Sequence, residues 1–308
     1  MRVARARRSR ACARARTRTR GAALLLVLWL ITLLTALVGG FALVARIEAL
    51  QGRVLASGAA AQAAARAGLE YALTRVDHAD PRLQWRPDGS PQAWQFGAAE
   101  VEVMLVDENG RVDLNHADYA LLEALLRRVG VEAAPAQRMA GAVVDWRDPD
   151  PLTQPAGGGE DADYASAGLP YGAKDAPFES VAELEQVLGF TPEVYDLLRP
   201  HVTVFSGRAR PDAAFASAEV LDAMGMDGAQ VVEARRQVDP VTGRPLGALP
   251  SETGLVVGSR SGTYSIRSRA RLADGRESEL RAVVRVGGSA VPGMAYTALQ
   301  WEEGASPR

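Results

Sequence analysis

An unbroken apolar stretch from Ala22 to Ala45 limits what this 308-residue chain can fold into. Its 24 residues carry no charge. As a helix rising ~1.5 Å per residue, the stretch would be about 36 Å long, enough to cross a hydrocarbon core of roughly 30 Å with some tilt. It is longer than the apolar region of a cleavable secretory signal, which has about 7–15 residues. We therefore predict a transmembrane helix over residues 22–45.

Charge is distributed unevenly around this stretch. Residues 1–21 contain nine arginines and no acid, so the rest of the chain has 35 − 9 = 26 basic against 37 acidic residues, a net charge of −11. A basic flank is typical of the cytoplasmic side of a membrane segment, which predicts that the body lies on the opposite side. An acidic body disfavours binding to nucleic acid, because phosphate contacts require positive charge.

The apolar pattern continues beyond Ala45 without a helix breaker. Apolar residues recur every three or four positions as far as Val76, and Asp80-Pro81 ends the run. We therefore predict one long N-terminal helix over residues 22–80, of which the second half is amphipathic. Its alanine-rich stripe favours close packing against a sheet or another helix. An ordinary anchor followed by a soluble core helix would explain the same pattern.

Strand patterns occur at both ends of the remaining chain. Residues 81–98 are rich in Pro, Gly and Gln and are predicted to form a loop. Val101–Val106 alternates loosely, and Glu108-Asn109-Gly110 predicts a hairpin turn into Arg111–Leu114. In the C-terminal part, 263–272, 280–286 and 296–301 are predicted strands. We expect one sheet built from residues 99–114 and 255–302, interrupted in the sequence by another domain.

The interrupting residues, 115–250, are predicted to form an α-helical domain. Three segments, 120–139, 181–198 and 217–235, each contain a helix, a glycine and a second helix, which is the pattern of a helix-hairpin-helix unit. The three glycines expected to adopt positive φ in these turns are Gly130, Gly189 and Gly225. Such units often bind DNA, but these turns carry acidic residues. We expect no nucleic-acid partner; a membrane-anchored DNA-uptake protein is the alternative.

An acidic loop over residues 145–163 is the candidate binding site. Prolines and three consecutive glycines allow this segment to fold back on itself. Hard oxygen donors on a pliable loop suit Ca²⁺, although a solvated acidic loop without a metal explains the spacing equally well. The carboxylates are Asp145, Asp148, Asp150, Glu160, Asp161 and Asp163. The three histidines are scattered, and no phosphate loop or nucleophile elbow occurs, so we expect no enzymatic activity.

Several of these segments resemble a known family. The leader ending at Gly21, before Ala22, is similar to the prepilin-type signal. The stretches VDENGRVDLNHAD, VVDWRDPDPLTQPAGGGEDADY and PFESVAELEQVLGFTPEVYDLLRPHVTVFSG resemble the protein K family of type II secretion minor pseudopilins. This resemblance implies an α+β fold: a pilin-like long N-terminal helix packed on an antiparallel sheet, with a large inserted helix-hairpin-helix (SAM-like) domain. It also implies calcium bound around the acidic loop, with its six carboxylates as the candidate ligands.

The resemblance also implies a function. A prepilin peptidase would remove residues 1–21, and Ala22 would be methylated. Most pilins have Glu at the fifth mature position, where this chain has Leu26. A subunit at the tip has no amine above it to pair with a buried carboxylate, so leucine fits a tip position.

The implied protein is a non-enzymatic subunit of the pseudopilus tip that joins other minor pseudopilins. It would sit in the bacterial inner membrane as a single-pass protein, with its N-terminus in the cytoplasm and its soluble domain in the periplasm. The alternative is a periplasmic enzyme or receptor that keeps its inner-membrane anchor permanently.

Overall fold

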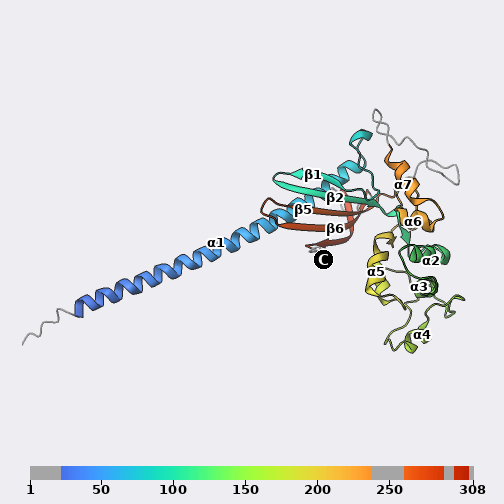
Figure 1. Ribbon diagram of the computed structural model, residues 1–308, viewed down its shortest axis with the longest axis horizontal. Coiled ribbons are helices and arrows are strands. Elements are labelled where there is room, and N and C mark those ends of the chain that lie inside the picture. The colour runs from blue at the N-terminus through green and yellow to red at the C-terminus, as the bar shows by residue number, and fades with distance from the viewer. Residues whose placement is uncertain (1–21, 238–259, 288–294, 305–308) are drawn as a thin grey trace, which may run out of the picture. The chain divides into compact units, whose positions relative to one another are not determined.

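The computed structural model describes residues 22–237, 260–287 and 295–304 (Figure 1). The predicted leader with its cut site at Gly21, residues 238–250 of the predicted helical domain, and residues 255–259 and 288–294 of the predicted sheet lie outside the described residues. The chain divides into two compact units, residues 1–56 and 57–308, which are considered separately.

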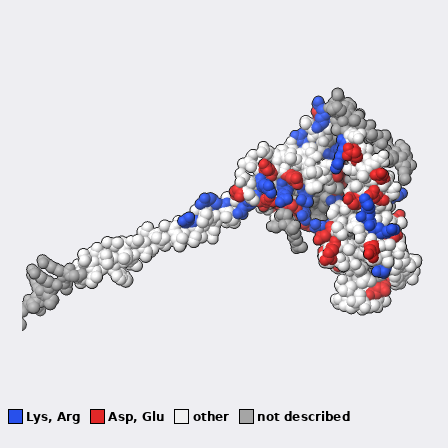
Figure 2. All heavy atoms as spheres, viewed as in Figure 1, with Lys and Arg blue, Asp and Glu red and all other residues white. Residues whose placement is uncertain are grey.

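Helix α1 (Ala22–Val76) is one continuous helix of 55 residues, as the apolar pattern predicts, and it ends four residues before the expected boundary. Within the first unit its side chains are exposed. By length and composition, α1 alone among the described helices could cross a membrane. In Figure 2, the part of α1 nearest its N-terminus carries no acidic or basic side chains.

The second unit contains a five-stranded antiparallel sheet in the order β1-β2-β5-β6-β7. All described helical elements except α1 and η1 lie between β2 and β5 in the sequence, yet these two strands are neighbours in the sheet. A helical domain is therefore inserted into the sheet, which confirms the predicted α+β fold. The strands are β1 (Gln92–Phe96), β2 (Ala99–Asp107), β5 (Thr263–Arg271), β6 (Glu277–Val286) and β7 (Tyr296–Glu303).

The second half of α1 packs on one face of this sheet through small residues. Alternate residues of β2 are buried against it, including Val101 and Val103, because successive strand side chains point to opposite faces. A Cβ on Gly68 would lie 2.3 Å from Ser268 Oγ and 2.7 Å from Val101 Cγ1, so the close approach requires glycine. The alanine-rich stripe therefore packs against a sheet, as predicted. The buried residues of α1 are Ala61, Ala64, Ala65, Gly68, Leu69, Ala72 and Val76.

The predicted hairpin after β2 is wrong. The chain leaves the sheet at Asp107, whose side chain accepts a hydrogen bond from Asn109 N at 2.9 Å and caps the 3-10 turn η2 (Glu108–Gly110). The next strand, β3 (Val112–Asp113), pairs in parallel with β4 (Val202–Thr203) in a separate small sheet. Strand β2 pairs instead with β1, which lies in the segment 81–98 that the sequence predicted as a loop.

The inserted domain is helical, and each of its three predicted glycine turns is present. Gly130, Gly189 and Gly225 have φ of 103°, 88° and 84°. Asp118 is the N-cap residue of the first helix of this domain, and its side chain accepts a hydrogen bond from Leu121 N at 2.8 Å. The helical elements of the chain besides α1 are η1 (Pro81–Leu83), α2 (Tyr119–Arg128), α3 (Ala133–Arg147), α4 (Asp161–Ser166), η3 (Val181–Gln186), α5 (Pro192–Leu198), η4 (Arg199–His201), α6 (Ala218–Ala223) and α7 (Gly228–Arg236).

Candidate metal centre

The last turn of α3 and the loop after it form the centre of the acidic segment. Asp145 is fully buried, and its Oδ2 accepts hydrogen bonds from Gly159 N at 2.8 Å and Gln154 N at 3.4 Å. A Cβ on Gly158 would lie 1.8 Å from the same Oδ2, and one on Gly141 would lie 1.9 Å from Gly157 O. The glycines therefore allow the backbone to fold over α3 and enclose the Asp145 carboxylate.

Glu160, Asp161 and Asp163 lie at the start of α4. Glu160 is the N-cap residue and its side chain is buried, with 8% exposed. Asp163 Oδ2 accepts a hydrogen bond from Glu160 N at 3.0 Å, so this carboxylate caps the helix. Asp161 is exposed in the first turn, where its Oδ1 lies against Gly172. The structure thus places Asp163 in a helix-capping position and Asp161 in the exposed first turn of α4.

The other four predicted carboxylates lie near enough to one another for their charges to interact. Burial, followed by the negative charges of Asp145 and Asp148, raises the pKa of Glu160 to about 7, and Asp150 contributes further. Burial and then the charge of Asp150 raise the pKa of Asp148. Asp145 Oδ1, Asp148 Oδ1 and Glu160 Oε1 are buried and have no hydrogen-bond partner. Asp145 and Glu160 are enclosed by protein, Asp148 is half-buried and Asp150 is exposed.

The structure adds a fifth carboxylate that sequence reasoning missed. The negative charge of Asp175, between α4 and η3, also contributes to the raised pKa values of Glu160 and Asp148. Asp175 lies outside the acidic loop, and nothing in its local sequence marks it. Its position becomes visible only when the loop after α4 returns toward α3.

These residues fit a hard cation. Burying a carboxylate oxygen without a hydrogen bond is costly, and neighbouring carboxylates repel one another. A divalent cation would remove both costs, and oxygen donors on a pliable loop are the ligands Ca²⁺ prefers. In the part of the chain that the structure describes, no three His, Cys, Asp or Glu side chains already have coordinating geometry. Binding of a cation would therefore require these carboxylates to move closer together around the ion.

The remaining candidate residues lie elsewhere. Ala22 is the first residue of α1, and Leu26 follows on the same helix with 69% of its surface exposed. The histidines contact different local partners: His116 Nδ1 lies 3.1 Å from Asp113 Oδ1, and His201 Nδ1 lies 3.0 Å from Ser217 Oγ. His78 contacts the backbone of Asp80. Ser217 is the N-cap residue of α6, where its Oγ accepts a hydrogen bond from Val220 N at 3.4 Å, so the His201–Ser217 contact lies at a helix start.

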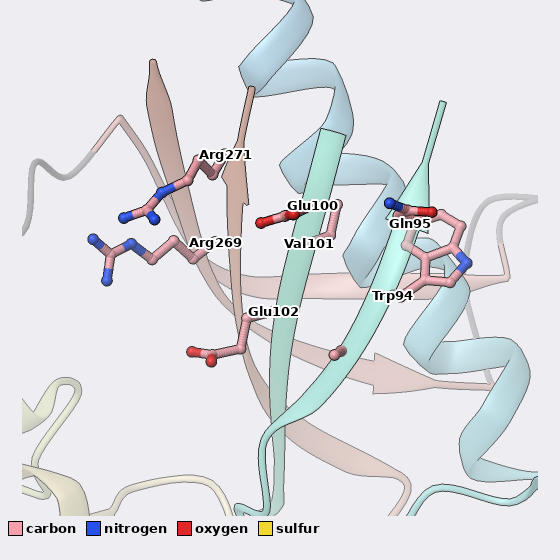
Figure 3. Close-up of a pocket in the computed structure, with 8 residues that line it drawn as sticks. Trp94, Gln95, Glu100, Val101, Glu102, Arg269 and Arg271 are labelled. Atoms are coloured by element: carbon pink, nitrogen blue, oxygen red, sulfur yellow. The ribbon is translucent and has the colours of Figure 1, made fainter. Parts of the chain in front are cut away.

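A shallow cavity of about 570 Å³ lies over β1, β2 and β5 and contains none of the predicted site residues. Figure 3 shows Glu100 and Glu102 of β2 beside Arg269 and Arg271 of β5. Both guanidinium groups donate to Glu277 of β6, and Arg271 Nε lies 2.7 Å from Glu277 Oε1. The charged side chains at this surface are thus held by pairing between neighbouring strands.

Comparison with known proteins gives consistent matches. Residues 103–207 match the family model described as type II secretion system (T2SS), protein K. Type II secretion system protein K of Pectobacterium carotovorum subsp. carotovorum is 31% identical over 121 residues, which cover 36% of this chain and 37% of that protein. The same-named protein of Aeromonas hydrophila is 30% identical over 148 residues, covering 44% and 45%. The chain therefore matches less than half the length of these curated relatives.

The fold is similar to a solved structure over most of the chain. The match is to the crystal structure of the GspK-GspI-GspJ complex from the enterotoxigenic Escherichia coli type 2 secretion system, with a TM-score of 0.55 and 19% identity. It covers 85% of this chain and 99% of that chain. At this identity the likeness establishes the pilin-like fold with its helical insertion. The sequence matches add that residues 103–207, which run from β2 into the inserted domain, are similar to type II secretion system protein K, in agreement with the predicted family.

Proposed function

We propose that the chain is a minor pseudopilin at the tip of the type II secretion pseudopilus, with a structural rather than an enzymatic role. The observation that carries this proposal is the protein K match over residues 103–207, where β2 of a pilin-like sheet leads into the inserted domain. Helix α1 supplies a membrane-spanning half and a half that packs on the sheet. The solved relative is in complex with GspI and GspJ, so we propose equivalent minor pseudopilins as partners.

The proposed maturation is tested at Gly21. A prepilin peptidase in the inner membrane would cut before Ala22, where α1 begins, and leave the chain with a periplasmic soluble part and a methylated N-terminus. N-terminal sequencing of the membrane fraction should therefore start at Ala22, and Gly21→Ala should block processing and secretion. Gly40→Ala is a matched control, because no atom lies within 4 Å of the Cβ it would add. A mature chain starting at Met1 or within residues 42–47 would favour the permanently anchored enzyme or receptor.

The proposed tip position is tested at Leu26. A glutamate there would place a carboxylate within the bilayer, and a subunit at the tip has no amine above it to pair with that charge. We therefore expect Leu26→Glu to reduce secretion and co-purification with the other minor pseudopilins, whereas Leu26→Ile should leave both unchanged. Normal assembly of the Leu26→Glu protein would contradict the tip position.

We also propose that the acidic cluster binds Ca²⁺ through Asp145, Asp148, Asp150 and Glu160. The unpartnered buried oxygens of three of these residues support the proposal. A chelator should lower the melting temperature of the full chain in detergent, and added Ca²⁺ should restore it. Asp145→Asn should weaken the Ca²⁺ response. If the melting temperature of the wild-type protein changes with neither chelator nor Ca²⁺, the site is excluded.

A further inference from the structure

The segment between α4 and η3 is fastened by the single lysine of the chain, Lys174. Its Nζ donates hydrogen bonds to Glu183 Oε2 at 2.9 Å and to Pro177 O at 3.0 Å. The Lys174 and Glu183 side chains are 25% and 15% exposed, so solvent screens this ion pair less than one on an open surface. Glu183 Oε1 also accepts from Glu179 N and Ser180 N, at 2.8 and 3.1 Å. The ammonium therefore holds the loop against the start of η3.

The same glutamate reaches the helix that carries Asp145. Trp146 Nε1 lies 3.4 Å from Glu183 Oε2, and Trp146 directly follows Asp145 in α3. The Phe178 ring packs against the Trp146 indole with 6.2 Å between their centroids. Lys174, Glu183 and Trp146 thus connect the loop to the base of the acidic cluster.

The residue after Lys174 has an unusual backbone. Among the residues that the structure describes, Asp175 is the one non-glycine residue with positive φ, at 53°. Aspartate tolerates this left-handed conformation better than most residues, but it still costs free energy and is kept where the surroundings enforce it. Asp175 is exposed, whereas Asp145 and Glu160 are buried and have oxygens without partners.

We propose that Asp175 is a ligand at the rim of the cation site and that the Lys174–Glu183 ion pair is the positioning element that holds it there. The inference rests on the Ca²⁺ site proposed above and extends its ligands beyond the acidic loop. The ion then connects three segments that are separate in sequence: the end of α3, the start of α4 and the loop before η3. Ion binding would stabilise the inserted domain because it joins these segments.

Asp175→Asn tests the ligand, because asparagine also accepts the left-handed conformation. The probe is Ca²⁺ itself, titrated by calorimetry into the full chain in detergent, with Tb³⁺ luminescence sensitised by Trp146 as a second readout. We expect the Ca²⁺ dissociation constant to rise by about tenfold or more, as ligand charge count sets the affinity of such sites. The melting temperature of the chelated protein should stay the same or rise, since one negative charge leaves the cluster. Asp196→Asn, on exposed α5, is the charge-matched control.

Lys174→Ala tests the positioning element, and Lys174→Arg tests its rescue. Loss of an outer-shell partner typically weakens metal affinity by about 10–100-fold, so Lys174→Ala should fall in this range. Lys174→Arg should regain most of the affinity because it can still pair with Glu183. The readout is the rise in melting temperature on adding Ca²⁺, which a purely structural role of Lys174 would leave unchanged. Ca²⁺ should also slow acetylation of Lys174 by an amine-reactive reagent, followed by mass spectrometry.

The outcomes separate the two proposals. Wild-type protein that binds neither Ca²⁺ nor Tb³⁺ would overturn the cation site and this inference with it. If wild type and Asp175→Asn bind Ca²⁺ equally well, the site stands and the role of Asp175 is overturned. If Asp175→Asn is weakened but Lys174→Ala is not, the positioning role of the ion pair is overturned.

Discussion

The sheet and the inserted helical domain each bury acidic side chains, but they neutralise them differently. In the sheet, Glu279 is 2% exposed and forms ion pairs with Arg267 at 3.6 Å and Arg281 at 2.5 Å. In the inserted domain, Asp145 and Glu160 are also buried, yet their charged neighbours are other carboxylates. Arginines of the sheet therefore neutralise its buried carboxylate, whereas the buried carboxylates of the inserted domain lack a positive partner, which a cation from solution can supply.

Strand geometry explains the first case. The register places Glu279 opposite Arg269, with Arg267 two residues away on β5 and Arg281 two residues away on β6, all on one face. No such register orders the acidic loop, where glycines wrap the backbone around Asp145. In neighbouring strands, the register thus places acidic and basic side chains side by side on one face. A folded-back loop has no such register, so carboxylates can lie next to one another.

The largest expected effect concerns what the two regions share, an apolar core. Leu125 in the inserted domain and Leu69 in the α1–sheet core are both fully buried. Either leucine changed to alanine should lower the free energy of unfolding by about 2–5 kcal/mol, since a cavity remains. Denaturant unfolding of the full chain in detergent measures this, with exposed Leu197→Ala as the control. If Ca²⁺ abolished the effect of Leu125→Ala, the inserted domain would depend on the ion more than on its core.

The second prediction tests the unbalanced charge through pH. The pKa of Glu160 is about 7 when folded against an ordinary value of 4.5, so the folded state binds more protons between these pH values. Chelated protein should therefore become more stable as pH falls from about 7 to 4.5, by at most about 3 kcal/mol. Thermal unfolding across this range checks it, and Glu160→Gln should flatten the profile. Saturating Ca²⁺ should reverse the slope, because protons then compete with the ion.

The third prediction concerns close packing in the sheet half. Gly68→Ala places a Cβ within 2.3 Å of Ser268 Oγ and 2.7 Å of Val101 Cγ1. Overpacking of this kind costs about 1–3 kcal/mol, which outweighs the better helix propensity of alanine. Gly58→Ala in the same helix meets only Arg276 Nη1, at an ordinary 3.7 Å, and should be neutral or stabilising. Equal melting temperatures for the two variants would contradict the packing of α1 on the sheet.

The smallest effect is expected on the outer face of the sheet. Glu277 accepts from Arg269 and Arg271, and these hydrogen bonds hold its pKa below the ordinary value. Because water screens the group, Glu277→Gln should lower the melting temperature only slightly, and less in high salt. The change should not alter the Ca²⁺ response, in contrast to Glu160→Gln. A large loss of stability would mean that the exposed charge array matters as much as the cores.

Local patterns in the sequence were sufficient for most elements. The continuous helix from Ala22 and the positive-φ glycines of the helical turns depend on neighbours within a few positions. The strands β5 and β6 were likewise predictable from alternation around the turn at Gly275, whose φ is 82°. Short-range hydrogen bonds and side-chain periodicity determine all of these features.

Strand pairing needed the whole chain. The residues after Asp107 had the composition of a hairpin turn, but the buried Glu108 accepts a hydrogen bond from Ser265 at 2.5 Å and is bound by Thr203, from the sheet and the inserted domain respectively. These distant partners compete with the local turn and direct the chain out of the sheet. Strand β1 was missed because its segment has no clear alternation, and pairing with β2 together with the stacking of Trp94 on Tyr71 holds it in place.

The sequence by itself determined that an apolar N-terminal helix carries an acidic body, and that six carboxylates lie on one glycine-rich loop, because both are properties of contiguous residues. Only the tertiary structure decided which carboxylates meet. It turned Asp163 to a helix cap, enclosed Asp145 and Glu160 without hydrogen bonds for their free oxygens, and brought in Asp175 from beyond the loop. The physical reason is that burial and mutual repulsion depend on distances through space, which spacing along a chain does not encode.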